Sequence, residues 1–109
     1  MVKIYKQKGV FISNACFVPA WRGLMFARKL GKEEAIIMDV SKYPPFVIHM
    51  AFVFQTIDVA FLDHNYKVIE VYKRVKPFSL SIRPKAHPWY VIEGSSLDLK
   101  VGDRLRFAA

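Results

Sequence analysis

The sequence contains few of the residue types on which most recognisable catalytic or metal sites depend. Its 109 residues include 1 cysteine, 3 histidines and 5 glycines. A lone cysteine excludes a disulfide within the chain, and Cys16 stands between Ala15 and Phe17, where a thiol is expected to pack as a small hydrophobe. The glycines are scattered singly, so the sequence encodes no glycine-rich loop for nucleotide phosphates.

The histidines do not form a metal-binding pattern. His49, His64 and His87 are far apart in the sequence and have no partner cysteine at a ligand spacing. We therefore expect no metal and no cofactor. Ser95 follows Gly94 but lacks the glycine-flanked spacing of a hydrolase nucleophile, so we expect it in a turn.

Long hydrophobic runs are also missing. The longest nearly apolar stretch, residues 46–62, contains His49, Gln55, Thr56 and Asp58, whereas a membrane-spanning helix needs about 20 apolar residues. The first residues include lysines but no apolar core followed by a small-residue cleavage site. We therefore expect a cytoplasmic protein that does not bind membranes.

Apolar and positively charged residues are abundant. Hydrophobic residues make up 53% and aromatic residues 15% of the chain, enough to build the core of a single domain over residues 1–109. Lysine and arginine number 17 against 9 acidic residues, which gives a net charge of +8. Such a balance attracts polyanions, so nucleic acid is a candidate partner through a basic surface.

The hydrophobic pattern favours many short strands. Segments rich in β-branched and aromatic residues alternate with turns that contain glycine, proline or asparagine. The segments expected to be strands are residues 2–5, 10–18, 35–40, 46–63 (as two strands), 67–75, 79–83, 89–93 and 104–107. They predict a mainly β fold, a sandwich or partly open barrel of short, mostly antiparallel strands.

One short helix is expected at about residues 20–30. Pro19 suits a first helical turn, and Gly31 suits a position just beyond the last one. The residues that fall on one stripe of this helix are Ala20, Gly23, Ala27 and Leu30. Small side chains there would let the helix lie close to a sheet.

Two carboxylates stand in otherwise apolar strands. Asp58 shares a strand face with Ala60 and Leu62, and Glu93 shares one with Val91. A buried carboxylate needs donors or a countercharge, because burying it alone costs several kcal/mol. Two such groups can act as acid and base around a cleft, or each can be paired in a structural ion network.

Arg22 is the cation that we expect to pair with them. On a regular helix it would join Lys29 on the solvated side. If the helix begins at Gly23 instead, its guanidinium could hold Asp58 or Glu93 through two hydrogen bonds. Large aromatic residues could stack on a ligand or belong to the core; they are Trp21, Phe26, Trp89 and Tyr90.

The order of several short motifs resembles one known family. The motifs are Trp21-Arg22-Gly23-Leu24-Met25-Phe26, Ile36-Ile37-Met38, His49-Met50, Ile57-Asp58-Val59-Ala60-Phe61-Leu62-Asp63, Tyr90-Val91-Ile92-Glu93 and Val101-Gly102-Asp103. Together, over residues 16–107, they are similar to the family of small bacterial and archaeal proteins catalogued as domain of unknown function 192. The resemblance implies a mainly β domain with a short helix and no established activity.

The resemblance also implies which residues bind a ligand and which maintain the structure. The polar signature of the family falls on the candidate ligand-binding residues Arg22, Asp58, Glu93 and Asp103. Its structural companions fall on Gly23, Leu24, Met25, Met50 and Gly102.

Three functions remain open at this point. The first is a non-enzymatic module in which Arg22, Asp58 and Glu93 line a cleft that binds a small polar ligand. The second is a basic β domain that binds nucleic acid through strands such as residues 67–76. The third is a hydrolase that uses Asp58 and Glu93. The chain is expected to be a monomer or a homodimer.

Overall fold

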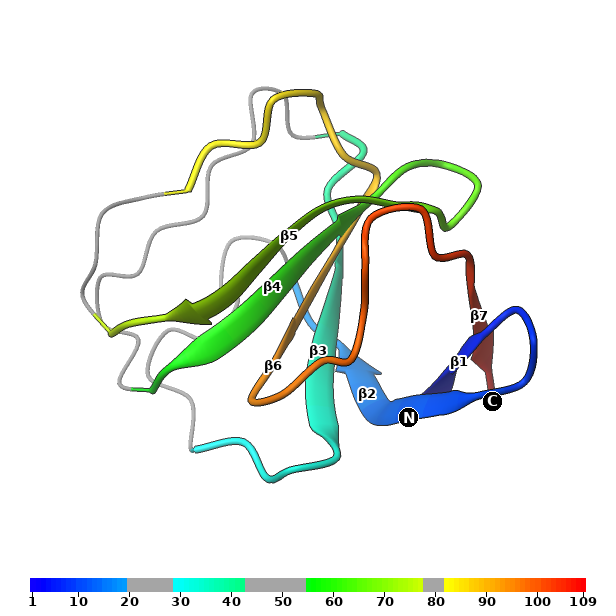
Figure 1. The fold of residues 1–109 in the computed structure, drawn as a ribbon, viewed down its shortest axis with the longest axis vertical. Helices are drawn as coiled ribbons and strands as arrows, with labels where there is room; N and C mark the ends of the chain where they lie inside the picture. Colours follow the sequence, from blue (N-terminus) through cyan, green and yellow to red (C-terminus); the bar gives the residue numbers. More distant parts are fainter. Residues whose placement is uncertain (20–28, 43–54, 78–81) are drawn as a thin grey trace.

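Seven β-strands make up the regular structure of the described residues. The computed structural model describes residues 1–19, 29–42, 55–77 and 82–109, and Figure 1 shows their arrangement. The strands are β1 (Val2–Lys6), β2 (Phe11–Phe17), β3 (Glu34–Asp39), β4 (Ile57–Leu62), β5 (Val68–Val75), β6 (Tyr90–Gly94) and β7 (Leu105–Ala108). They form one seven-stranded sheet in the order β5-β4-β6-β3-β2-β1-β7. Neighbouring strands run antiparallel, except that β2 and β3 are parallel.

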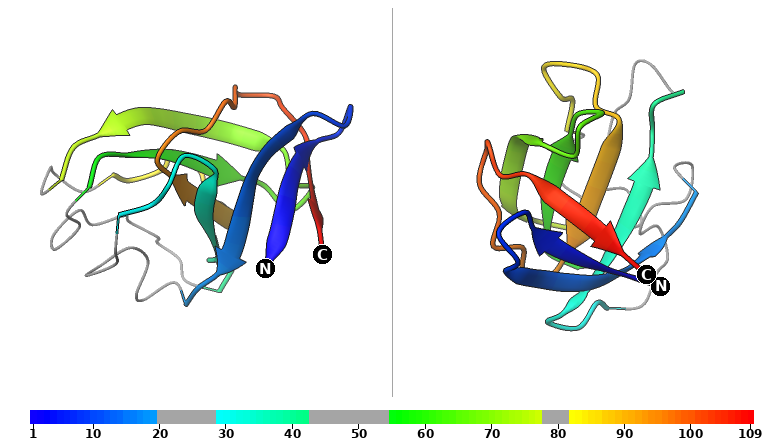
Figure 2. Two further views of the ribbon diagram at one scale, coloured as in Figure 1. Left: turned by 90° about the horizontal axis from the view of Figure 1, so that it is seen from below. Right: turned by 90° about the vertical axis from the view of Figure 1, so that its right-hand side faces the viewer.

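The sheet curls until its two edge strands meet at one end. The start of β5 and the approach to β7 share backbone hydrogen bonds, in which Val68 N donates to Asp103 O at 2.8 Å. Lys67 and Arg104 form an isolated antiparallel bridge at the same place. The result is a half-barrel, and both views in Figure 2 show the strong curvature of the sheet.

Alternation along the strands gives the curled sheet two apolar faces. The inner face carries a cluster to which all seven strands contribute, together with Leu97 and Leu99 from the segment after β6. The outer face carries a second cluster, which consists of Ile36, Met38, Val40, Ile57, Val59, Phe61 and Val91. Successive residues of a strand point to opposite faces, so neighbours in sequence belong to different clusters.

The predicted fold class is confirmed, because the protein is mainly β and forms a partly open barrel of short, mostly antiparallel strands. The predicted hairpin between β4 and β5 is also present. In its turn, Asp63 Oδ1 accepts hydrogen bonds from Asn65 N at 2.9 Å and from Lys67 N at 3.0 Å. This bonding of an aspartate to the backbone that follows it explains why the chain reverses there.

Parts of the prediction fall outside the described residues. The helix expected at residues 20–30 lies there, except for Lys29 and Leu30, which belong to no regular element. The first of the two strands expected within residues 46–63, and most of the strand expected at residues 79–83, also lie outside them. Among the residues that the structure describes, no helix is long and apolar enough to cross a membrane.

Cys16 contradicts its prediction, because the thiol is exposed rather than packed. It pairs in register with Ile36 and therefore lies on the outer side of β2. The outer cluster draws most of its residues from β3 and β4 and includes none from β2. The apolar residue Ala15, next to Cys16, belongs to the inner cluster and so does not bury the thiol.

Candidate functional site

Asp58 lies on the inner face of β4, opposite a β-bulge in β5. The register between the two strands shifts between Ile57 and Val59, so that Lys73 and Arg74 both stand opposite Asp58. Arg74 has a φ of 53°, a left-handed conformation that non-glycine residues rarely adopt. A bulge with this backbone conformation needs hydrogen bonds from nearby groups to stabilise it.

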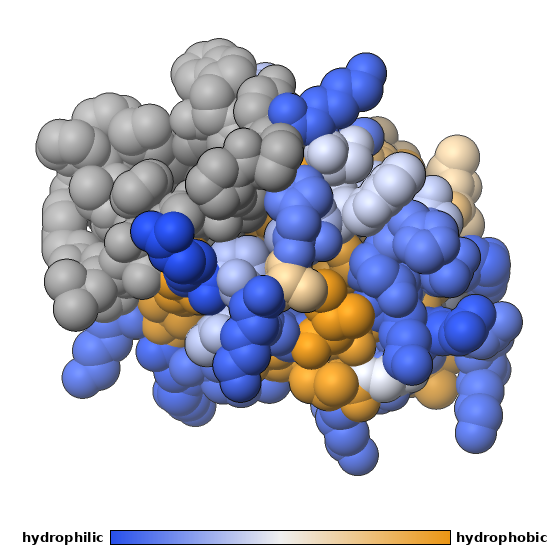
Figure 3. Space-filling view, turned by 90° about the horizontal axis from the view of Figure 1, so that it is seen from above, coloured by the Kyte–Doolittle hydropathy of each residue, from blue (hydrophilic) through white to orange (hydrophobic). Residues whose placement is uncertain are grey.

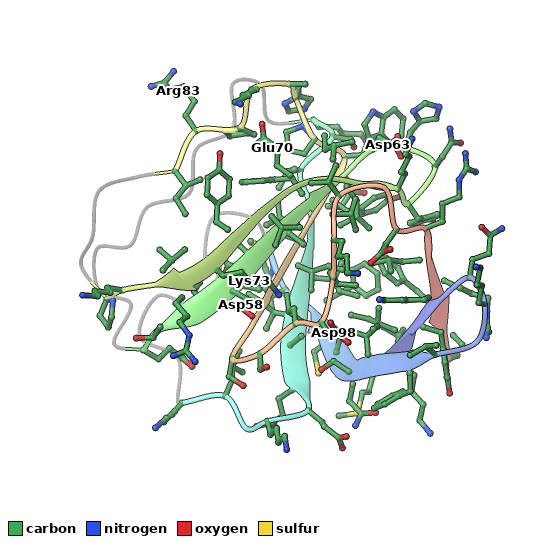
Figure 4. The ribbon with its side chains drawn as sticks, viewed as in Figure 1. Asp58, Asp63, Glu70, Lys73, Arg83 and Asp98 are labelled. Carbon is green, nitrogen blue, oxygen red and sulfur yellow. The ribbon has the colours of Figure 1, made fainter. Side chains whose placement is uncertain are left out.

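The Asp58 carboxylate supplies that support. Asp58 is 7% exposed, and its Oδ1 accepts a hydrogen bond from Arg74 N at 2.9 Å. Its Oδ2 accepts another from Leu97 N at 2.8 Å and lies 3.5 Å from the Lys73 ammonium. Lys73 also donates to Leu97 O. Asp58 and Lys73 therefore both hydrogen-bond to Leu97 and hold the segment after β6 against the β4–β5 hairpin. Figure 4 shows Asp58 and Lys73 close together.

Gly94 stands directly opposite Asp58 in β6. A Cβ atom at Gly94 would lie 2.9 Å from Leu97 Cδ2 and 3.3 Å from Glu34 O, which is closer than ordinary van der Waals contact. Because Gly94 has no side chain, Leu97 can pack into the inner cluster, where it is 1% exposed. The glycine and the Asp58 carboxylate therefore position the same segment.

Glu93 is the next residue in β6, but its side chain lies on the outer face. It pairs with Ile36 in β3 and Val59 in β4, both of which belong to the outer cluster. Glu93 is 3% exposed, and burial raises the pKa of its carboxyl group to about 7. Within the described part of the chain, no hydrogen bond or ion pair reaches this carboxyl group. It is thus a buried acid near the midpoint of its titration at neutral pH.

The two predicted carboxylates therefore lie on opposite faces of the sheet. The prediction that Asp58 and Glu93 line one cleft is wrong, and so is the carboxylate pair that a hydrolase would need across an open pocket. The physical reason is strand alternation: Asp58 is opposite Gly94, so Glu93 points away from it. Arg22 lies outside the described residues, among which the countercharge of Asp58 is Lys73.

Asp103, another candidate ligand residue, serves the turn before β7. Its Oδ2 accepts a hydrogen bond from Lys100 N at 2.8 Å and lies 3.3 Å from the Lys6 ammonium. The hydrogen bond from Lys100 N, with the nearby charge of Lys6, lowers the pKa of the Asp103 carboxyl group. Gly102, with a φ of 99°, has the left-handed backbone conformation that favours glycine. These contacts give both residues structural roles.

Lys73 is not among the site residues predicted from the sequence. In the sequence it stands next to Arg74 and has the parity of Val71 and Val75, so it interrupts the apolar face of the alternating strand. Only the bulge brings its ammonium beside Asp58. The remaining predicted motif residues lie outside the described residues; they are Gly23, Leu24, Met25 and Met50. In the described ranges no three His, Cys, Asp or Glu side chains are placed to hold a metal ion.

Comparisons with known proteins relate this sequence and fold to others. The family described as Uncharacterized ACR (DUF192) matches residues 17–107. A UPF0127 protein of Pyrococcus horikoshii is 33% identical over 96 residues, which cover 84% of this chain and 81% of that protein.

Solved structures with the same fold include a protein of unknown function from Novosphingobium aromaticivorans DSM 12444. It has a TM-score of 0.80 and 20% identity, and the match covers 96% of this chain and 82% of that chain. A proposed transcription regulator from Sinorhizobium meliloti 1021 has a TM-score of 0.79 and 20% identity, over 97% of this chain and 91% of that chain. At this level of identity the likeness shows the fold alone.

Proposed function

The chain belongs to the DUF192 family of uncharacterised proteins, and on that premise we propose that it is a non-enzymatic module that binds a small polar ligand at Glu93. One observation carries the proposal: Glu93 is 3% exposed, lies among apolar side chains and has no partner for its carboxyl group among the described residues. Buried polar groups are normally hydrogen-bonded. A ligand that brings a donor or a positive charge to this carboxyl group would offset the cost of burying it.

The surroundings of Glu93 define the chemistry of the ligand. Ile36, Val59 and Val91 flank the carboxyl group on the outer face. In such an apolar setting, attraction between opposite charges is stronger than in water. An ammonium or guanidinium group would favour the ionised form of Glu93, so we expect small amines and guanidines to bind more tightly than neutral polyols.

Binding is favoured over catalysis because acid–base chemistry on this face would require a second, available group. Glu70 is another carboxylate on the outer face, since it pairs in register with Phe61. Its Oε1 accepts a hydrogen bond from Lys85 N at 2.8 Å, and its Oε2 accepts one from the Tyr72 hydroxyl at 3.3 Å. Glu70 is thus already engaged, whereas no group in the described ranges engages Glu93.

A thermal-shift titration with primary amines, guanidines and polyols tests the proposal. A ligand at about 100 times its Kd adds about 2.7 kcal/mol, which raises the Tm of a domain of this size by on the order of 10 °C. Glu93→Gln should lose most of the shift that cationic compounds cause, because an amide has no charge. Glu33→Gln removes an exposed carboxylate instead and should keep the shift.

The pH dependence sharpens this test. The affinity of the wild-type protein for a cationic ligand should rise between about pH 6 and pH 8, as Glu93 ionises, and should not change in Glu93→Gln. If no compound stabilises the wild type more than it stabilises Glu93→Gln, the proposal fails. Sequence analysis expects Arg22 to pair with Asp58 or Glu93. If its guanidinium reaches Glu93, Arg22→Gln should strengthen the binding of the same cationic ligands, because the variant lacks the competing positive charge.

A further inference from the structure

The outer side of β1, β2 and β7 carries an exposed ring, Phe11, a half-buried ring, Tyr5, and cations that the proposed ligand site does not use. Register places Phe11 in β2 beside Tyr5 in β1, and Tyr5 beside Arg106 in β7. Leu105 belongs to the inner cluster, so Arg104 and Arg106 on either side of it point outward. These three strands lie nearest the viewer in the right-hand view of Figure 2.

Like charges meet where β5 joins this surface. Lys67 and Arg104 are direct partners in the antiparallel bridge, and both are exposed. Gln7 N donates to Arg104 O at 2.8 Å, which brings the β1–β2 turn and Lys8 alongside. We call the surface formed by Tyr5, Phe11, Lys8, Lys67, Arg104 and Arg106 the basic aromatic face.

The rings of this face are arranged so that one remains open to solvent. The ring centroids of Tyr5 and Phe11 are 5.7 Å apart, with the rings edge to face at 69°. The guanidinium of Arg106 covers one side of Tyr5, with Cζ 4.7 Å from the ring centroid. Phe11 is 37% exposed. An exposed phenylalanine ring, next to a tyrosine that a guanidinium covers, can stack on an unpaired base.

The cations of the face are not neutralised within the described part of the chain. None of Lys8, Lys67, Arg104 and Arg106 makes an ion pair there. Asp103 precedes Arg104, but its carboxylate pairs with Lys6 at 3.3 Å. In Figure 3, which shows the molecule from above, the right-hand part of the surface is predominantly hydrophilic. Since like charges directly opposed in a sheet are destabilising, an external anion would relieve the repulsion.

We propose that the basic aromatic face binds single-stranded nucleic acid. Phosphate groups contact Lys67, Arg104 and Arg106, and a base stacks on Phe11. A duplex keeps its bases stacked on one another and offers no free face to this ring, so the single strand is favoured. The proposal is independent of the ligand at Glu93, which lies on β6 rather than on these strands.

Fluorescence anisotropy with a labelled oligo(dT) of about 12 nucleotides tests the proposal. The wild-type protein should bind at roughly 50 mM salt and lose affinity steeply by roughly 200 mM. Arg104→Glu should lower the affinity about tenfold or more and reduce the slope of log K against log salt by about one. The new carboxylate stands opposite Lys67, so the Tm should stay unchanged or rise, and unfolding would not explain the loss. Absence of binding by the wild type at low salt overturns the proposal.

Arg83→Glu is the matched control. Arg83 is exposed, and in Figure 4 it projects from the side of the molecule opposite β7. The substitution changes the net charge by the same amount as Arg104→Glu but should alter the affinity by no more than about twofold, because salt screens distant exposed charges. Equal losses in the two variants would mean that overall charge alone attracts the oligonucleotide, and would overturn the proposal.

Phe11→Ala distinguishes nucleic acid from other polyanions. It should weaken oligo(dT) binding about tenfold and leave heparin binding unchanged, since only bases stack on the ring. Phe17→Ala removes a ring that is 54% exposed from the inner side of β2, and should change neither. If Phe11→Ala leaves oligo(dT) binding unchanged, the nucleic-acid assignment is wrong. Glu93→Gln should bind oligo(dT) as the wild type does, which separates this proposal from the ligand at Glu93.

Discussion

Asp58 and Glu93 are two buried carboxyl groups at almost the same level of the β4–β6 pair, and their environments are opposite. Asp58, 7% exposed on the inner face, accepts hydrogen bonds from two backbone N–H groups and faces the Lys73 ammonium. Glu93, 3% exposed on the outer face, has no such partner among the described residues. Burial of a carboxyl group therefore does not by itself define its role.

The difference arises from the elements that surround each group. Asp58 stands opposite a bulge that turns Arg74 N toward it, and the segment after β6 folds back to present Leu97 N. Glu93 stands between regularly paired residues, Ile36 and Val59, in the middle of the sheet. The backbone N–H groups of regular strands bond to neighbouring strands and are not available to a side chain.

Asp58→Ala should have the largest effect on stability. It leaves Arg74 N and Leu97 N without their acceptor and Lys73 without its carboxylate, so we expect a loss of about 3–5 kcal/mol in the free energy of unfolding. Urea unfolding followed by tryptophan fluorescence measures this loss. A cost below about 1 kcal/mol would mean that water replaces the carboxylate, and the contrast with Glu93 would disappear.

Glu93→Gln should have the opposite effect on stability at high pH, where it should raise the free energy of unfolding. The folded-state pKa of about 7 lies above the reference value of 4.5, so between these values the folded protein binds more protons than the unfolded chain. The stability of the wild type therefore falls as the pH rises through this window, by about 3 kcal/mol in total. Glu93→Gln has no proton to lose there and should be more stable above about pH 8.

Unfolding curves at about pH 4.5 and about pH 8.5 check this sign. The two proteins should be similar at the lower pH, where Glu93 is protonated and neutral like glutamine. A difference that is the same at both pH values would show that Glu93 ionises without cost, and that the two carboxyl groups are more alike than their contacts indicate.

Gly94→Ala tests the packing that the Asp58 site depends on. The added methyl group would meet Leu97 Cδ2 and Glu34 O, so we expect a loss of about 1–3 kcal/mol. Ser96→Ala, at an exposed position two residues on, should change stability by less than about 0.5 kcal/mol. Equal stability of the two variants would show that Leu97 does not need the close approach to Gly94.

Lys73→Met should have the smallest effect. The Lys73 side chain is 48% exposed, and ion pairs in such positions contribute about 1 kcal/mol or less. Asp58 keeps its hydrogen bonds from Arg74 N and Leu97 N in this variant. The same urea titration measures this effect. A loss as large as that of Asp58→Ala would show that Asp58 stabilises the fold through the ion pair rather than through its hydrogen bonds with the backbone donors.

Local patterns in the sequence were sufficient to predict much of the fold. The alternation from Lys67 to Val75 and the Asp63-His64-Asn65 turn predicted the β4–β5 hairpin that the structure contains. The same reasoning grouped Asp58 with Ala60 and Leu62, and register confirms that they share the inner face. It could not locate the bulge, because a bulge shows itself only when two strands are paired.

By itself, the sequence determined that this chain forms a mainly β sheet and that a carboxylate at position 58 needs partners, because residue alternation and the cost of burying charge are local properties. The tertiary structure alone decided that Lys73, Arg74 and Leu97 supply those partners, and that Glu93 faces the other way. These outcomes depend on strand order, register and the path of the chain after β6, which arise from contacts between residues distant in sequence.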